Sequence, residues 1–305
     1  MNSVNSVGRD IAADGEAVRL LYPLRLEEGP TGDAEDRGPY GGVAIDVETT
    51  GLDWRTGKVI ELAARRFRYN RAGVITHIDR PYEWRQDPGE SLSPEISRLT
   101  GLTDADLVGQ EIDEIGAANV LSSTSFVVAH NSRFDRPWIE ALLEGARGLR
   151  WACSMSEIDW RAEGFDGRTL GFLLMQAGFY HCGHRAGADV DALIQLLRRR
   201  FRDGRTALAH MIENAARPTW LFRARGADFS TKDALKARGY RWDAEGRVWW
   251  REVADADRHP EEWWLASHVY SDARAGALGP EVREVTARTR YLPLLDDASA
   301  AEPTI

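Results

Sequence analysis

Hydrophobic and polar positions follow different patterns in successive parts of the chain. From Gly41 an apolar run bounded by glycines, GGVAIDVE, predicts a buried strand. Residues 58–70 and 73–84 predict two further strands that form a hairpin. A later apolar stretch, SSTSFVVAHN, predicts another buried strand that runs into a helix. Three strands in succession, followed by alternating strands and helices, predict an α/β fold with a mixed central sheet.

Two later segments carry apolar residues at the spacing of an amphipathic helix. Residues 168–179 and 187–201 each place leucine and alanine side chains on one face. Shorter helices are expected between residues 94 and 107, because Ser93 and Thr103 stand at positions typical of helix N-caps. The helices are expected to flank the central sheet.

The same pattern divides the chain into five parts. Residues 1–38 are rich in glycine and acidic residues and are expected to form a flexible N-terminal extension, in which AVRLLYPLRL is a candidate for packing on the body of the protein. The α/β domain is assigned to residues 39–205 and a linker helix to 206–216. A small basic and aromatic α+β module is expected at 217–275, followed by a tail at 276–305 with little pattern.

The first strand carries two acidic residues in a place where charge is costly. Asp46 and Glu48 are two positions apart, so their side chains point to the same face of the strand. An ionised carboxylate beside an apolar core is unfavourable unless a cation compensates it. An exposed edge strand would carry such a pair without consequence. A cation site is the alternative, and it requires further acids.

Two more acids and a histidine complete a candidate site. Asp135 follows an apolar strand at the start of a helix, and Asp189 lies in the first turn of another helix, five residues after His184. Taken singly, each acid is typical of a helix N-terminus, and His184 is typical of a surface or capping histidine. Four converging carboxylates would repel one another unless they held a cation, and oxygen ligands suit Mg²⁺ or Mn²⁺. Asp191 competes with Asp189 for this role but is expected to point away, at the surface.

Such a site has the parts that phosphoryl hydrolysis needs. Two divalent ions can bind the attacking and leaving oxygens of an in-line displacement at phosphorus. A histidine on a loop beside the ions can deprotonate the attacking water. His184 is the candidate for this general base.

The three acidic segments, IDVETTGL, AHNSRFD and HRAGAD, resemble the three motifs of the DEDDh 3′→5′ exonucleases. That family includes the proofreading subunit of bacterial DNA polymerase III, RNase T and oligoribonuclease, and the resemblance implies an RNase H-like fold. It covers residues 40–205, roughly, and PEISRLTGLTDADL is similar to the family's segment before the second motif. A sister group has tyrosine four residues before the final aspartate. This chain has Arg185 there and is of the histidine type.

The resemblance also implies the roles of individual residues. The implied metal ligands are Asp46, Glu48, Asp135 and Asp189, with His184 as general base. The residues implied to hold the 3′-terminal nucleotide are Thr49, Leu52, His130, Asn131 and Phe134. The implied reaction uses two Mg²⁺ or Mn²⁺ ions to hydrolyse a 3′-terminal phosphodiester and releases nucleoside 5′-monophosphates.

Composition is that expected of a soluble globular protein: of the 305 residues, 43% are hydrophobic and 29% charged. No apolar run approaches the roughly 20 residues that span a bilayer. The first residues lack the pattern of a secretory signal, and two cysteines do not make a disulfide framework, so a cytoplasmic location is expected. A net charge of −9 argues against coating nucleic acid with cations, and leaves room for an enzyme that grips phosphate through metal ions.

Basic charge gathers in the C-terminal module. Residues 217–251 hold nine lysines and arginines and four acids, with tryptophan, tyrosine and phenylalanine between them. Aromatic platforms with cations hold single strands. The alternative is that the aromatic residues form a core and the arginines face water. YRWDAEGRVWW predicts a hairpin in which Gly246 is available for a positive φ. The segment is similar to a short module of DNA-processing and mobile-element proteins, and is expected to position substrate or a partner.

The leading hypothesis is a metal-dependent 3′→5′ exonuclease that acts on single-stranded or frayed DNA ends in proofreading or repair. DNA 3′ ends are the expected substrate, and a DNA polymerase or repair protein is a candidate partner. Two alternatives stay open: an exoribonuclease that trims RNA ends, and a non-catalytic module that tethers a polymerase.

Overall fold

The computed structural model describes residues 9–11, 17–35, 38–181, 183–271 and 279–292. The chain forms two compact units, Met1–Ala215 and Ala216–Ile305. None of the helices in the described ranges is both long and apolar enough to cross a membrane.

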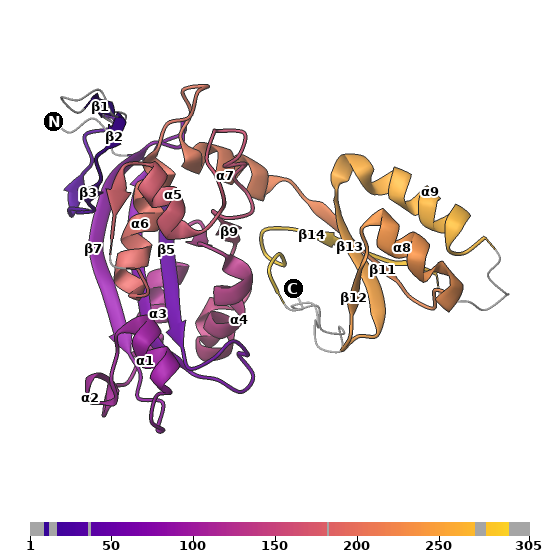
Figure 1. Cartoon of the computed structure of the whole chain (residues 1–305), viewed down its shortest axis with the longest axis horizontal. Coiled ribbons are helices and arrows are strands. Elements are labelled where there is room, and N and C mark those ends of the chain that lie inside the picture. Colours follow the sequence, from indigo (N-terminus) through magenta and orange to yellow (C-terminus); the bar gives the residue numbers. More distant parts are fainter. Residues whose placement is uncertain (1–8, 12–16, 36–37, 182, 272–278, 293–305) are drawn as a thin grey trace. The chain divides into compact units, whose positions relative to one another are not determined.

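The first unit is built on a six-stranded mixed sheet with strand order β4-β7-β6-β5-β8-β9 (Figure 1). The strands from β4 to β5 are antiparallel, and β5, β8 and β9 run parallel. The strands are β4 (Gly29–Pro30), β5 (Tyr40–Thr49), β6 (Val59–Tyr69), β7 (Ile75–Arg85), β8 (Val127–Ala129) and β9 (Trp151–Cys153). The predicted hairpin and the mixed central sheet are confirmed.

Helices cover both faces of this sheet. α6 (Ala186–Arg198) packs over β5, β6 and β7, and Figure 1 shows it with α5 (Leu170–Gln176) in front of the strands. α4 (Ser132–Leu142) contacts β5, β8 and β9, and α3 (Glu114–Ser122) contacts β6. Ala44 packs in one core cluster with residues of α5 and α6. Val43, Ile45 and Val47 alternate with it and are buried as well, so both faces of β5 are covered.

Both expected N-caps are present at the short helices α1 (Pro94–Thr100) and α2 (Asp104–Leu107). The Ser93 hydroxyl accepts a hydrogen bond from the Ile96 N–H at 3.2 Å. At α2 the Asp106 carboxylate accepts from the backbone N–H of Thr103 at 2.8 Å. Both helices therefore begin where the sequence predicts.

The N-terminal extension differs from the sequence-based expectation of flexibility. β1 (Arg9–Ile11) pairs with β2 (Ala17–Arg19), β3 (Tyr22–Pro23) with β10 (Phe179–Tyr180), and β4 with the edge strand β7. Leu24 and Leu26 pack against the main core. The described residues 20–35 thus lie on the first unit, because β4 covers an edge of the sheet whose backbone groups need partners.

The helix expected as a linker also belongs to the first unit. α7 (Ala207–Ala216) places Ala207, Leu208 and Met211 in the main core cluster, each fully buried. The Thr206 hydroxyl before it donates to the Gly73 carbonyl at 2.6 Å. The helix is amphipathic, and its apolar side is covered by the same core as α5 and α6.

In its described residues the second unit has a four-stranded antiparallel sheet, in the order β12-β13-β11-β14, and the helices α8 and α9. The elements are β11 (Thr219–Ala224), α8 (Lys232–Arg238), β12 (Arg241–Asp243), β13 (Val248–Ala254), α9 (Arg258–His268) and β14 (Glu281–Val285). Short 3-10 helices precede α8 and α9, η2 (Phe229–Thr231) and η3 (Asp255–Asp257). A third, η1 (Glu144–Ala146), belongs to the first unit. The predicted hairpin is present as β12 and β13.

Two expectations for this unit are wrong in detail. The tail assigned to 276–305 contributes β14, which pairs with β11 along its whole length, and further along Arg290 and Tyr291 are buried. In the hairpin turn the positive φ falls on Arg247, at 48°, rather than on Gly246. A Cβ at Gly246 would lie 2.7 Å from the Asp243 carboxylate, so a larger residue there would require that side chain to move.

The position of α7 leads to a test of the first unit's boundary. Leu208→Ala removes a fully buried side chain and should lower the free energy of unfolding by about 2–5 kcal/mol. Leu99→Ala is the matched control, because Leu99 is 48% exposed. Urea denaturation followed by circular dichroism measures both variants. Equal effects of the two substitutions would show that α7 is not part of the core.

Candidate active site

β5 presents two carboxylates toward α6. Ala44, Asp46 and Glu48 alternate along the strand and share one face, and Ala44 packs in the core cluster that includes Val190 of α6. Pairing between β5 and β6 shifts register between Glu48 and Thr49. The strand therefore delivers both acids just before its regular pairing ends.

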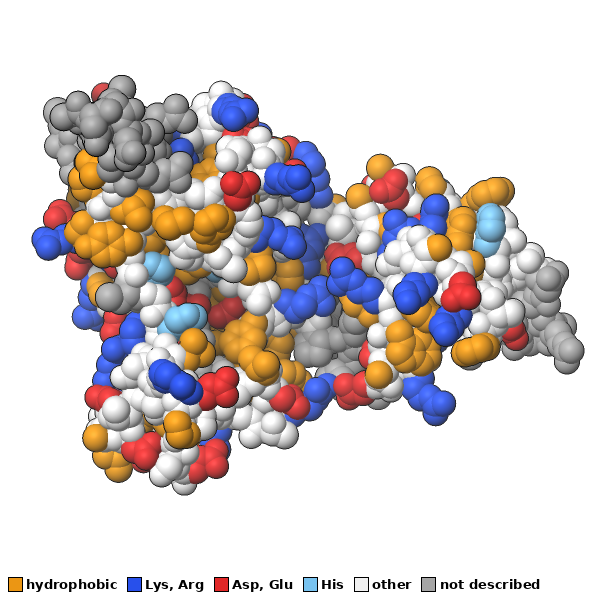
Figure 2. All heavy atoms as spheres, in the orientation of Figure 1, with side chains coloured by type: hydrophobic (Ala, Val, Ile, Leu, Met, Phe, Trp, Pro, Cys, Tyr) orange, Lys and Arg blue, Asp and Glu red, His pale blue; other side chains and the backbone are white. Residues whose placement is uncertain are grey.

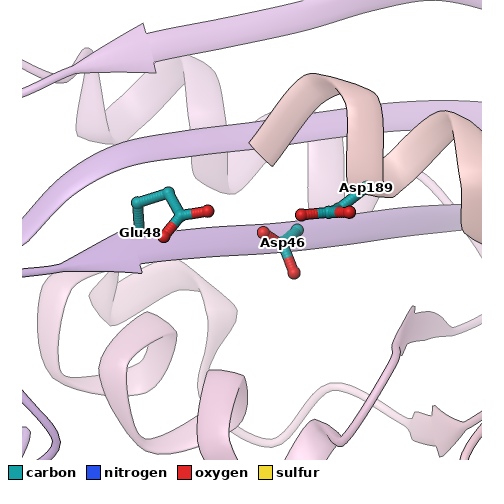
Figure 3. Close-up of side chains that lie close together, drawn as sticks. All are labelled: Asp46, Glu48 and Asp189. Carbon is teal, nitrogen blue, oxygen red and sulfur yellow. The ribbon is translucent and has the colours of Figure 1, made fainter. Parts of the chain in front are cut away.

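The third acid comes from α6. Asp189 lies in the first turn of this helix. Its ligand oxygen and those of Asp46 and Glu48 all lie within 4.8 Å of one another. Figure 3 shows the three side chains converging in the space between strand and helix. The structure thus brings together three of the four acids expected at the metal site.

Asp135 lies nearby but outside that group of three. It stands in the first turn of α4 and is 2% exposed. Burial is the largest cause that raises the pKa of its carboxyl. Hydrogen bonds from the backbone N–H groups of Asp135 and Val47 lower this pKa, and the charges of Glu48 and Asp189 raise it. Its own charge in turn raises the pKa of Asp46. Asp135 is therefore an electrostatic neighbour of the other three.

Burial and mutual repulsion act on the two strand acids. Burial raises the pKa of Asp46 well above its ordinary value, and the charges of Asp135, Asp189 and Glu48 add to this. Burial also raises the pKa of Glu48, to about 7, with the charge of Asp189 acting in the same direction and that of Arg185 opposing it. Protein cations compensate this negative charge only in small part. Bound divalent cations would compensate far more of it.

The loop before α6 holds Asp189 from two sides. The backbone N–H of His184 donates to Asp189 Oδ2 at 2.9 Å. His181 Nε2 lies 2.6 Å from Asp189 Oδ1, within hydrogen-bond distance. The side chain of His184 is exposed, and its φ is 63°, a left-handed conformation that histidine adopts more readily than most residues.

His181 is the residue of this site that the sequence reasoning missed. Its side chain is only 9% exposed and contacts the metal-ligand candidate directly, whereas the side chain of His184 is exposed. A signal was available, since His181 stands eight residues before Asp189 in the same loop. Spacing alone could not show which histidine faces the carboxylate.

Glu61 fixes the other end of this loop. It lies opposite Glu48 in the β5–β6 pair and is 1% exposed. Its carboxylate accepts hydrogen bonds from the Arg185 guanidinium, at 3.0 and 3.3 Å, and from the Ala186 N–H at 3.1 Å. A buried acid on β6 thus anchors the N-terminus of α6, and with it Asp189.

A second ion pair sets the rotation of α6. Asp191 Oδ1 lies 2.7 Å from the guanidinium of Arg65, whose side chain is 3% exposed. Asp191 is therefore not part of the group of carboxylates, as expected. It does not simply face solvent, however, because it neutralises a buried arginine on the same face of β6 as Glu61.

The residues expected to hold the terminal nucleotide surround the end of β5 and the start of α4. Thr49 is buried, and its hydroxyl donates to the Gly51 carbonyl at 2.6 Å. Leu52, in the loop that follows, is 89% exposed. Phe134 is half-buried, with its ring 6.1 Å from that of Trp138.

His130 and Asn131 have evident structural roles at this point. Both ring nitrogens of His130 are engaged, at 2.7 Å each, by the Ser154 hydroxyl and the Arg168 carbonyl. Burial lowers the pKa of His130. Asn131 takes a left-handed conformation, with φ of 83°, as the N-cap of α4. Any contact of His130 with a substrate would use the face or a carbon edge of its ring.

The donor set fits a hard divalent cation. Three carboxylates supply oxygen only, their oxygens converge, and nearby cationic side chains leave most of their charge uncompensated. Mg²⁺ and Mn²⁺ prefer such ligands and leave room for water and phosphate oxygens.

The family model described as Exonuclease (RNase T) matches residues 43–197, just over half of the chain. This range contains β5, α4 and α6 with all four acids. The chain belongs to the RNase T exonuclease family. Its fold class and its assignment as a nuclease follow from that membership, and the resemblance seen in the three sequence motifs is confirmed.

Curated relatives of this RNase T-type exonuclease domain include polymerases. The chain is 42% identical over 95 residues to "DNA polymerase III PolC-type" of Halalkalibacterium halodurans. The matched segment covers 30% of this chain and 6% of that protein. The chain is 33% identical over 104 residues to the protein of the same name from Streptococcus pyogenes serotype M5, which covers 33% and 7%. The chain thus spans less than a tenth of the length of the curated relatives it matches.

Solved structures of exonucleases are also similar. "Exonuclease X in complex with 5′ overhanging duplex DNA" matches with 20% identity and a TM-score of 0.38 over 55% of this chain and 99% of that chain. E. coli Exonuclease I in complex with a dA16 oligonucleotide matches with 17% identity and a TM-score of 0.44 over 82% and 64%. At these scores neither likeness bears on the roles of particular residues.

The raised pKa of Glu48 predicts how stability depends on pH without metal. The folded value is about 7 against an ordinary 4.5, so the stabilisation associated with its protonated form is complete below pH 4.5 and lost as pH rises to 7. In EDTA, Glu48→Gln should therefore raise the melting temperature above pH 7, and this gain should vanish below pH 4.5.

The control for that prediction is Glu90→Gln, which changes an exposed glutamate in the same unit. Added Mg²⁺ should stabilise the unsubstituted chain more than Glu48→Gln, because the ion compensates the charge that the variant lacks. Differential scanning fluorimetry across pH measures all of these. A gain for Glu48→Gln that does not depend on pH would contradict the electrostatic account.

Proposed function

We propose that this chain is a metal-dependent 3′→5′ exonuclease that removes nucleotides from single-stranded or frayed DNA ends in proofreading or repair. The observation that carries the proposal is the convergence of Asp46, Glu48 and Asp189 within 4.8 Å, beside a loop that bears His184. Such a group is costly to the fold without cations. Metal-dependent hydrolysis of a phosphodiester uses such converging carboxylates to hold its cations.

The four acids are the proposed metal ligands, with Asp135 completing the three that already converge. Two Mg²⁺ or Mn²⁺ ions held there would supply activation of water and neutralisation of charge on the phosphate. The chain's part is to hold the acids rigidly. β5 fixes two of them, the first turn of α6 the third, and Glu61 with Arg185 ties that helix to the sheet.

His184 is the proposed general base. Its backbone is fixed by the hydrogen bond to Asp189, while its imidazole is exposed and can take the proton of the attacking water at a ring nitrogen. Water then attacks the phosphorus of the last phosphodiester, the bond from phosphorus to the preceding 3′ oxygen breaks, and that oxygen takes a proton from solvent water. The products are a nucleoside 5′-monophosphate and a strand shorter by one nucleotide, with a new 3′-hydroxyl.

The end of β5 is the proposed seat of the terminal nucleotide. Leu52 offers an exposed apolar side chain four positions after Glu48, and Phe134 lies one position before Asp135. Exposed apolar groups beside a charged centre suit a nucleobase whose phosphate reaches that centre. Thr49, His130 and Asn131 shape the backbone around it.

The similarity to proteins named as polymerases supports a place in DNA synthesis or repair, and a DNA polymerase or repair protein is the proposed partner. Substrate class is tested directly by offering matched DNA and RNA ends.

A digestion time course tests polarity and substrate. With a 5′-labelled single-stranded DNA and Mg²⁺ or Mn²⁺, labelled products should shorten one nucleotide at a time, and the unlabelled product should be nucleoside 5′-monophosphate. EDTA should stop the reaction, and Asp46→Asn should slow it at least about 100-fold. Early release of a labelled mononucleotide would show that the chain digests from the 5′ end, contrary to the proposal. Faster digestion of the matched RNA would assign the chain to RNA ends instead.

The two histidines of the loop are separated by a matched pair of variants. His184→Gln should lower kcat about 100-fold or more, as loss of a general base does. His181→Gln should cost clearly less, because His181 holds Asp189 but is not the proposed proton acceptor. Steady-state rates at saturating Mg²⁺ measure both, with His259→Gln in the second unit as control. A larger loss for His181→Gln would transfer the role of base to His181.

A further inference from the structure

The second unit contains basic residues that its own acids neutralise and others that they do not. Four of the nine cations in residues 217–251 pair with two glutamates outside that range, Glu261 and Glu281. The paired residues are Arg223, Arg225, Arg238 and Arg251. Glu261 is 1% exposed, so much of the apparent basic character of this segment is internal charge balance.

The aromatic residues divide in the same way. Most belong to the core of this unit or pack against it: Trp220, Phe222, Tyr240 and Trp249. Phe229 and Trp242, in contrast, are 83% and 50% exposed. The core interpretation therefore explains most of the aromatic residues and fails for these two.

The two exposed rings line one pocket. Its volume is about 620 Å³. One side is formed by the end of β11 and the segment that leads into α8, and the other side by the β12–β13 hairpin. Phe229 and Lys232 line the first side, and Trp242, Arg247 and Trp249 the second. Figure 2 shows hydrophobic and basic side chains interspersed on the visible face of this unit.

Cations and rings are closely associated in this pocket. Lys232 Nζ lies 5.4 Å from the centre of the Phe229 ring, and the rings of Trp242 and Trp249 lie 5.5 Å apart at 58°. Among the described residues, neither Lys232 nor Arg247 forms an ion pair. The one acid of the lining, Asp228, is engaged with the N–H and hydroxyl of Ser230 through Oδ1.

We propose that this pocket binds single-stranded nucleic acid, with bases stacked on Trp242 and Phe229 and backbone phosphates contacted by Lys232 and Arg247. Exposed aromatic side chains are unfavourable in water, and nucleobases cover them by stacking without any need for a particular sequence. Two unpaired cations beside the rings match the negative charge that accompanies each base. A neutral apolar peptide would leave both cations without a partner.

This site does not depend on hydrolysis by the first unit, so it is tested by binding in EDTA. The full-length chain is titrated against fluorescein-labelled single strands of about 20 nucleotides, in DNA and RNA forms, and anisotropy is read. Trp242→Ala and Phe229→Ala should each raise Kd about tenfold. Trp263→Ala, which removes a tryptophan 69% exposed on α9 and outside the pocket lining, should leave Kd unchanged.

A charge variant tests the phosphate contacts separately. Lys232→Gln with Arg247→Asn removes both cations, and asparagine suits the left-handed backbone at position 247. The slope of log Kd against log salt should fall by about 1.4, the value for two phosphates on a single strand. Melting temperatures of all variants confirm folding, and hydrolysis of a dinucleotide in Mg²⁺ is measured in parallel.

The outcomes separate this proposal from the proposed activity. Weaker binding in the pocket variants supports the site even if the unsubstituted chain hydrolyses nothing. Folded pocket variants that bind both strands as tightly as the unsubstituted chain overturn it, even if that chain is an active nuclease. Loss of binding for DNA but not RNA, or the reverse, identifies which strand the pocket takes.

Discussion

Repulsion between buried carboxylates is the constraint on which the first unit depends. Asp46, Glu48 and Asp189 converge within 4.8 Å, and burial with mutual charge raises the pKa of the two strand acids. The charges of these groups oppose their convergence, and the hydrogen bonds to Asp189 and the charge of Arg185 offset the repulsion only in part. The rest of the fold must hold them there, and a bound cation repays the cost. A site of this kind is stable only on rigid elements, and it lies on the central strand and a core helix.

The means of holding them are visible around α6. Glu61 binds the N-terminal end of the helix through Arg185 and Ala186, and Arg65 binds Asp191 one turn further on. In one ion pair β6 supplies the acid, and in the other it supplies the arginine. Together the two pairs fix both the position and the rotation of α6 on β6. The loop of His181 and His184 then closes on Asp189. Binding chemistry in the second unit is of another kind, with exposed rings and unpaired cations in place of buried acids.

Much of the fold and most of the site could be read from local pattern. Alternation on β5 places Asp46 and Glu48 on one face wherever the strand lies, and helical spacing places Asp189 at the start of α6. The local pattern did not indicate two long-range strand pairings: β14 with β11, and the N-terminal strand β4 with β7. Short strands carry little periodicity, so their partners are set by open sheet edges and not by their own residues.

The sequence by itself determined which acids share a face or begin a helix, and so which residues form the candidate site, because strand and helix periods fix the direction of a side chain from its neighbours. Tertiary structure decided which charges remain available. It set Asp135 apart from the three converging acids, brought His181 to Asp189, and neutralised Arg223 and its paired neighbours with glutamates far along the chain. Pairing of charges depends on distance in space, and only the packed chain defines that distance.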